Sequence, residues 1–155
     1  MKKLFYLLFL PFTFLISCGN NDLAEVDLTI SLENVTVDSG KFYTVSGYEV
    51  SIESFYTQSL NGKNSTVANV RFYFEGVPLV GLPGVPDIGS FSTEYLDPGE
   101  YKLTAVGQVL QEDKSITDFY CVYPVVVVED ESDLPSDAPE IGTHSLSLRL
   151  TNSSN

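Results

Sequence analysis

Basic residues and histidine are scarce in this sequence. Eight lysines and arginines stand against 21 aspartates and glutamates, which gives a net charge of −13. A surface with this balance repels phosphates, so the sequence excludes nucleic acid as a partner. His144 is the only histidine, and neither a Gly-x-Ser-x-Gly nor a His-x-x-x-His pattern accompanies it. The sequence therefore predicts no enzyme, no metal site and no cofactor.

Helical periodicity is also missing after the first 25 residues. A period of two dominates instead: Leu28, Ile30 and Leu32 alternate with polar residues and so share one face of a half-buried strand. The same alternation recurs in residues 50–52, 70–74, 101–105 and 146–150. Turn dipeptides such as Ser39-Gly40 and Asn61-Gly62 separate these runs. The pattern predicts an all-β fold.

Residues 118–128 are apolar at both the odd and the even positions, which point to opposite faces of a strand. A strand that is apolar on both faces is typical of the middle of a sheet. Pro124 interrupts the run, and because proline donates no backbone hydrogen bond, we expect a bulge or a change of strand partner there. Cys121 lies in the same run, which predicts a buried and inert thiol.

The first 17 residues have the pattern of a secretory signal peptide. Lys2 and Lys3 precede an apolar run that ends in Leu15-Ile16-Ser17-Cys18, too short for a comfortable membrane-spanning helix. This ending resembles the lipobox of bacterial lipoproteins, in which the cysteine is lipidated and the chain is cut just before it. The resemblance implies a signal peptide over 1–17, lipid on Cys18 and a tether over 18–25. Cys121 would then have no disulfide partner.

A second resemblance concerns residues 96–103, Leu-Asp-Pro-Gly-Glu-Tyr-Lys-Leu. The pattern Asp-x-Gly-x-Tyr-x-Leu resembles the start of strand F in immunoglobulin-like domains, and residues 69–76 and 89–96 are similar to strands C and E of bacterial immunoglobulin-like and polycystic-kidney-disease-type domains. It implies an immunoglobulin-like antiparallel β-sandwich over 26–151 with an extra C-terminal strand and a tail over 152–155. It also implies a structural tyrosine corner made by Asp97, Gly99 and Tyr101.

Two further segments have open interpretations. The apolar loop over 76–89 is either a partner-binding loop or a short strand followed by residues that close one end of the fold. Its candidate contact residues are Val77, Leu79, Val80, Leu82, Val85 and Ile88. The acidic connector over 129–140 is either a solvated, flexible linker or a calcium ligand set, and its spacing matches no calcium loop.

The expected location is the cell envelope, with the membrane as a partner through the lipid on Cys18. Gly19 after the cysteine favours the outer membrane, and the side that the domain faces is not encoded. Two functions fit: a non-catalytic immunoglobulin-like module for protein or glycan contact, or a structural subunit of an envelope or surface assembly.

Overall fold

The described part of the chain consists almost entirely of strands. The computed structural model describes residues 25–80 and 89–150. Its elements are β1 (Val26–Asp38), β2 (Lys41–Val45), β3 (Glu49–Ser59), β4 (Ser65–Phe74), β5 (Val77–Pro78), β6 (Ser90–Ser92), β7 (Gly99–Gln111), β8 (Ile116–Val128), the 3₁₀ helix η1 (Glu131–Asp133) and β9 (Gly142–Arg149). The predicted all-β class is confirmed. Within these residues no helix is long and apolar enough to cross a bilayer.

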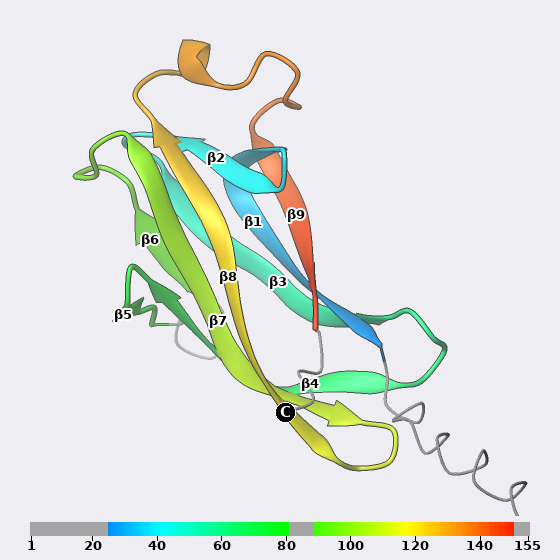
Figure 1. The fold of residues 1–155 in the computed structure, drawn as a ribbon. Coiled ribbons are helices and arrows are strands. Elements are labelled where there is room, and N and C mark those ends of the chain that lie inside the picture. Colours follow the sequence, from blue (N-terminus) through cyan, green and yellow to red (C-terminus); the bar gives the residue numbers. More distant parts are fainter. Residues whose placement is uncertain (1–24, 81–88, 151–155) are drawn as a thin grey trace, which may run out of the picture.

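The strands form one sheet that curls into a half-barrel (Figure 1). The order is β5-β4-β7-β8-β2-β1-β3-β6, and β9 pairs with β1. The expectation of a purely antiparallel sheet is wrong, because β2 runs parallel to β8. Ser39 and Gly40 both have positive φ, so β1 turns back tightly into β2, and β2 then lies beside the end of β8.

The half-barrel has two facing layers: β3, β6 and β9 belong to one, and β2, β4, β5, β7 and β8 belong to the other. Strand β1 takes part in both. Its first residues pair with β3 and β9, and its last three pair with β2. The change occurs around Asn34, whose φ of 63° interrupts the strand geometry. Two hydrogen bonds fix this corner: Asn34 Nδ2 donates to the Glu49 carbonyl at 2.8 Å, and Thr44 Oγ1 donates to the Asn34 carbonyl at 2.8 Å.

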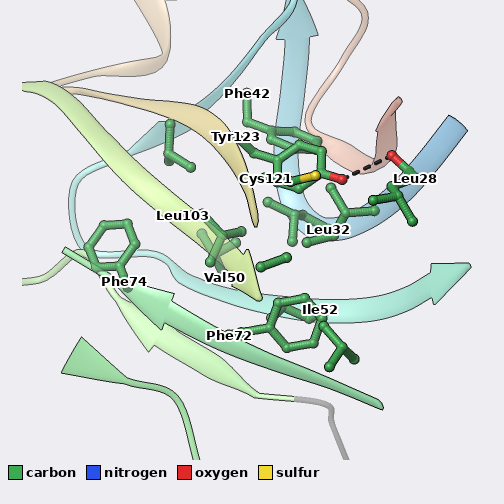
Figure 2. Packing of buried hydrophobic residues seen from close by; sticks show 14 of the residues in the cluster. Leu28, Leu32, Phe42, Val50, Ile52, Phe72, Phe74, Leu103, Cys121 and Tyr123 are labelled. Carbon is green, nitrogen blue, oxygen red and sulfur yellow. Dashed lines mark hydrogen bonds between the residues drawn. The ribbon is translucent and has the colours of Figure 1, made fainter. Parts of the chain in front are cut away.

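The core lies between the two layers and is formed by the alternating apolar residues. Leu28, Ile30 and Leu32 of β1 are fully buried, as their period of two predicts. They face Leu103 of β7 and Tyr123 of β8 (Figure 2). Phe74, Phe91 and Tyr101 extend the core with stacked rings, at centroid distances of 3.9 Å for the first pair and 5.8 Å between Phe74 and Tyr101.

Pro124 does not produce a bulge. The pairing of β7 with β8 runs from Gly99↔Val127 to Leu110↔Ile116 without a register shift and includes Lys102↔Pro124. A change of strand partner does not occur there either, because β8 keeps β7 through Pro124 and gains β2 as a second neighbour from Val125 onward. Among the described strands, β8 is therefore central in its last four residues and pairs only with β7 before them.

The C-terminal strand is present as β9 and lies outside β1. Leu146 and Leu148 face the core, while the serines between them face outward. Ser147 and Ser145 hydrogen-bond to Thr29 and Ser31 of β1 at 2.7 and 2.6 Å. Paired hydroxyls across two strands thus fasten this added edge to the sheet.

Candidate functional site

The outward face of β7 and β8 carries an exposed group of large apolar side chains, which we call the outer patch. Its members are Val106, Leu110, Ile116 and Tyr120, with exposed fractions of 36%, 41%, 59% and 71%. They form two directly opposed pairs, Val106↔Tyr120 and Leu110↔Ile116. Exposed apolar residues scattered singly are ordinary, but here two exposed apolar pairs lie on the same face of neighbouring strands.

A row of polar side chains crosses the outer patch between the two apolar pairs. Asn69 of β4, Gln108 of β7 and Asp118 of β8 are opposite one another on the three strands. Asn69 Nδ2 donates to Gln108 Oε1 at 2.8 Å, and Gln108 Nε2 donates to Asp118 Oδ1 at 2.8 Å. Each amide uses one of its two N–H hydrogens in this row, which leaves the second hydrogen of Asn69 and of Gln108 and the second oxygen of Asp118 to a ligand.

Arg71 adds the only nearby positive charge in this part of the described sheet. It is exposed on β4, and its Cα partner is Val106, so the order across the strands is Arg71, Val106 and Tyr120. An arginine, an aliphatic residue and a tyrosine side by side are the residue types enriched in protein contact surfaces. Planar amides and an exposed tyrosine ring also suit the flat faces of sugars.

The outward face of the other layer has a different character. Rows of Ser and Thr cross β9, β1 and β3, for example Ser145, Ser31 and Ser54. The hydroxyls of Thr29 and Ser147, and those of Ser31 and Ser145, are hydrogen-bonded to each other. The two outward faces are thus unequal, and the apolar one lies on β7 and β8.

The predicted partner-binding loop is only partly described. Leu82, Val85 and Ile88 lie outside the described residues. Val77 forms β5 opposite Phe74, as the short-strand interpretation expects. Leu79 donates its N–H to the Phe72 carbonyl at 2.9 Å and packs against the core, whereas Val77 and Val80 are 64% and 86% exposed.

The residues predicted to form a tyrosine corner lie at the start of β7. Tyr101 Oη donates to the carbonyl oxygen of Asp97 at 2.7 Å, which is the hydrogen bond that such a corner makes. The bond is exposed to solvent. An added Cβ at Gly99 would meet no atom within 4 Å, so no close approach requires glycine there.

The acidic connector has a defined path, contrary to the flexible linker expected. Asp130 and Asp133 cap η1 reciprocally, and Tyr48 Oη donates to Glu131 Oε1 at 2.7 Å. The bond to the Glu131 carboxylate raises the pKa of Tyr48. Farther along, Thr36 Oγ1 donates to the Pro139 carbonyl at 2.5 Å, and His144 Nε2 lies 2.8 Å from the Glu140 carbonyl. Over residues 25–80 and 89–150, no group of three His, Cys, Asp or Glu side chains could hold a metal ion.

Cys121 and Tyr123 are ionisable side chains of the core, and burial keeps both protonated at neutral pH. Cys121 is buried as predicted, and burial raises the pKa of its thiol to about 11, which leaves little thiolate at neutral pH. Tyr123 is fully buried, and burial raises its pKa above the ordinary range, with a smaller effect from Cys121. Tyr123 Oη donates to the Leu28 carbonyl at 2.9 Å across the two layers (Figure 2).

The sequence predictions missed the outer patch. Its signal was present, because residues 118–128 are apolar at both parities, but that pattern was interpreted as a central strand. The open half of β8 instead leaves the outward set exposed. Two other aromatic side chains are engaged elsewhere: the Phe55 ring packs against Phe72 at a centroid distance of 5.4 Å, and Tyr48 bonds to Glu131 of the connector.

No protein-family model matches this chain, and no curated protein is significantly similar to it.

Proposed function

We propose that this chain is an envelope lipoprotein that presents a non-catalytic immunoglobulin-like module for contact with a protein or glycan. The anchor is lipid on Cys18, which lies outside the described residues, and the outer membrane is the favoured location. The observation that carries the contact is the outer patch, where Tyr120 is 71% exposed on a regular sheet face. Tyr95 is exposed even more, at 89%, but it stands outside the patch, whereas Tyr120 lies beside Val106 and near Arg71, so it is the grouping that supports a partner surface.

The immunoglobulin-like assignment of the fold is part of the proposal. Strand pairing supports it: β4 pairs with β7, β7 with β8, and β3 with β6, as strands C, F, G, B and E of such domains do. The Tyr101 bond at the start of β7 supports the assignment of β7 as strand F. The parallel β2 and the added β9 are the departures from the plan expected from the sequence.

The anchor is tested by Cys18→Ser. Each buried methylene adds about 0.8 kcal/mol of membrane affinity, so two long acyl chains hold a protein on the membrane for biological times. We expect Cys18→Ser to lose palmitate labelling completely and Cys121→Ser to retain it. Labelled Cys18→Ser protein, or a mature N-terminus other than residue 18, would contradict the lipoprotein assignment.

The contact is tested by crosslinking in intact cells. The full-length protein carries photoreactive p-benzoylphenylalanine in place of Val106, and a matched control carries it in place of the exposed Thr143 on β9. We expect an adduct from position 106 that Leu110→Asp reduces several-fold and that position 143 does not form. Protease or glycosidase digestion of the adduct distinguishes a protein from a glycan partner. Equal adducts at both positions, or none at 106, would rule out the outer patch.

A second function, a structural subunit of an envelope or surface assembly, is favoured by one observation. Residues 116–124 of β8 have no strand partner on the side away from β7 within the described part of the chain. Unpaired edges of this length join other strands readily.

A further inference from the structure

The open edge of β8 is defined by its pairing. Strand β7 covers one side of β8 along its length, whereas β2 covers the other side only at Val125–Val128, near one end of β8 in Figure 1. No other described strand pairs with residues 116–124. This segment therefore presents one row of backbone donors and acceptors to the outside.

Backbone hydrogen bonds show which residues of β8 point their backbone groups toward the open edge. Ser46 N donates to the Val128 carbonyl at 2.9 Å, so Val128 faces β2 rather than β7. Because backbone groups alternate along a strand, Val122, Tyr120 and Asp118 face the open edge as well. The Lys102 carbonyl accepts from Glu75 N at 3.0 Å, so Lys102 also turns away from its opposite residue Pro124. Pro124 thus lacks an N–H only on the open side, which explains why the strand tolerates it.

We propose that this edge pairs antiparallel with the same edge of a second copy of this chain, with Tyr120 of each copy opposite its twin. A twofold axis at Tyr120 places Asp118 opposite Val122 and Ile116 opposite Pro124. An axis at Asp118 would place two carboxylates opposite each other, which is destabilising. An axis nearer Val126 would bring the second copy against β2. Charge and the position of β2 therefore exclude axes at Asp118 and near Val126, and among the registers that are left we choose the one that brings the two exposed Tyr120 rings together.

The side chains along the edge fit this occupant. The residues on the outward face of the open segment are Ile116, Asp118, Tyr120, Val122 and Pro124. The only charge among them is turned toward β7, because Gln108 Nε2 donates to Asp118 Oδ1, and Pro124 lies at the end of the segment. Natural sheets protect an open edge with charges that point into its path. The Asp118 carboxylate does not give this protection, because it points toward β7 and not across the edge. The 71% exposed Tyr120 ring would lie against the Tyr120 ring of the second copy on the joined sheet.

The inference rests on the second candidate function. It shares Tyr120 with the outer patch, but it uses the backbone edge of β8 rather than the face of the sheet. A twofold contact of one edge with itself closes after two copies, so the expected product is a dimer rather than a fibre. One strand per copy makes a small interface, and confinement of both copies to a membrane raises their effective concentration.

The register is tested by disulfide crosslinking of the full-length protein in membranes, in a Cys121→Ala background. Residues opposite each other in a hydrogen-bonded antiparallel pair have Cα atoms about 5.5 Å apart, within the range of a disulfide. We expect Tyr120→Cys to form a covalent dimer on mild oxidation. Asp118→Cys should not link to itself, since its twin is roughly 14 Å away along the strand, but it should link to Val122→Cys when the two variants are expressed together.

The edge itself is tested by adding Val122→Pro to Tyr120→Cys. The proline removes an outward N–H and leaves the pairing with β7 intact, as Pro124 does, so we expect the crosslink to fall at least tenfold with the melting temperature retained. Val106→Asp, on β7 and away from the edge, should leave the crosslink unchanged. Absence of the Tyr120→Cys dimer, equal linking of Asp118→Cys to itself, or a crosslink that survives Val122→Pro in folded protein would overturn the proposal. Loss of the outer-patch adduct with retention of this crosslink would reject only the first function.

Discussion

Replacing Gly107 by alanine is expected to destabilise the fold by about 3 kcal/mol or more, because no space exists for a methyl group there. A Cβ on Gly107 would lie 2.1 Å from the carbonyl oxygen of Asn69, 2.8 Å from Phe119 Cζ and 2.9 Å from the Cα of Val70. Two of these three atoms belong to the backbone of β4, so relief requires that strand to move. The register shift between Val67 and Asn69 already distorts β4 beside this point.

The matched control is Gly99→Ala on the same strand. An added Cβ at Gly99 would meet nothing within 4 Å, so its effect should stay within about 0.5 kcal/mol. Guanidinium denaturation followed by circular dichroism measures both variants. Since a domain is stable by about 5–15 kcal/mol in total, Gly107→Ala should shift the midpoint visibly or abolish folding. Equal midpoints for the two variants would show that β4 can withdraw from β7 at little cost.

The strands that could be predicted are those with one buried face. Leu28, Ile30 and Leu32 alternate with polar residues because β1 has solvent or hydroxyl rows on its other side, and the period of two survives in the sequence. Strand β2 was not predicted, because its polar residue Thr44 is buried and its hydroxyl donates to the Asn34 carbonyl. The alternation of buried apolar and exposed polar residues is therefore absent from this strand. Its parallel pairing with β8 depends on a contact between residues more than 80 positions apart, such as Phe42 and Val125, which no local pattern encodes.

The candidate site was less predictable than the fold. A strand that is apolar at both its odd and its even positions is expected to be buried on both faces. The inward-facing residues fulfil this expectation, since Val125 and Val127 are buried. The sequence cannot show that β2 ends after covering four residues of β8 and leaves Tyr120 exposed beyond it. Conversely, the Tyr101 bond to Asp97 was predictable because both residues lie within one turn of chain. A hydrogen bond between residues close in the sequence can be predicted from the local sequence. The exposure of a side chain depends on which distant strand packs beside it.

Replacing Tyr123 by phenylalanine is expected to destabilise the protein by about 1–3 kcal/mol, the cost of removing a hydrogen bond in a buried site. Tyr123 is 0% exposed, and its Oη donates to the Leu28 carbonyl of the opposite layer at 2.9 Å. The bond joins β8 to β1 through the core, and water cannot replace it. Tyr101→Phe is the matched control, because Tyr101 also donates to a backbone carbonyl but does so in solvent. Its cost should stay at about 0.5–1 kcal/mol, since water can take over the lost bond.

The same pair of variants predicts a pH dependence. Burial keeps the Tyr123 hydroxyl protonated by raising its pKa above that of an unfolded tyrosine, which is about 10. The stability linked to this group is therefore fully present below pH 10 and is lost as the pH rises above it, because only the unfolded chain releases the proton. Wild-type protein and Tyr101→Phe should both lose stability between neutral pH and pH 11 more steeply than Tyr123→Phe, which lacks the buried hydroxyl. Cys121, whose raised pKa of about 11 acts in the same direction, is common to all three proteins and cancels in the comparison. Parallel stability curves for the wild type and Tyr123→Phe above pH 10 would mean that the hydroxyl reaches solvent in the folded protein, and the bond between the two layers would then be too open to hold them together.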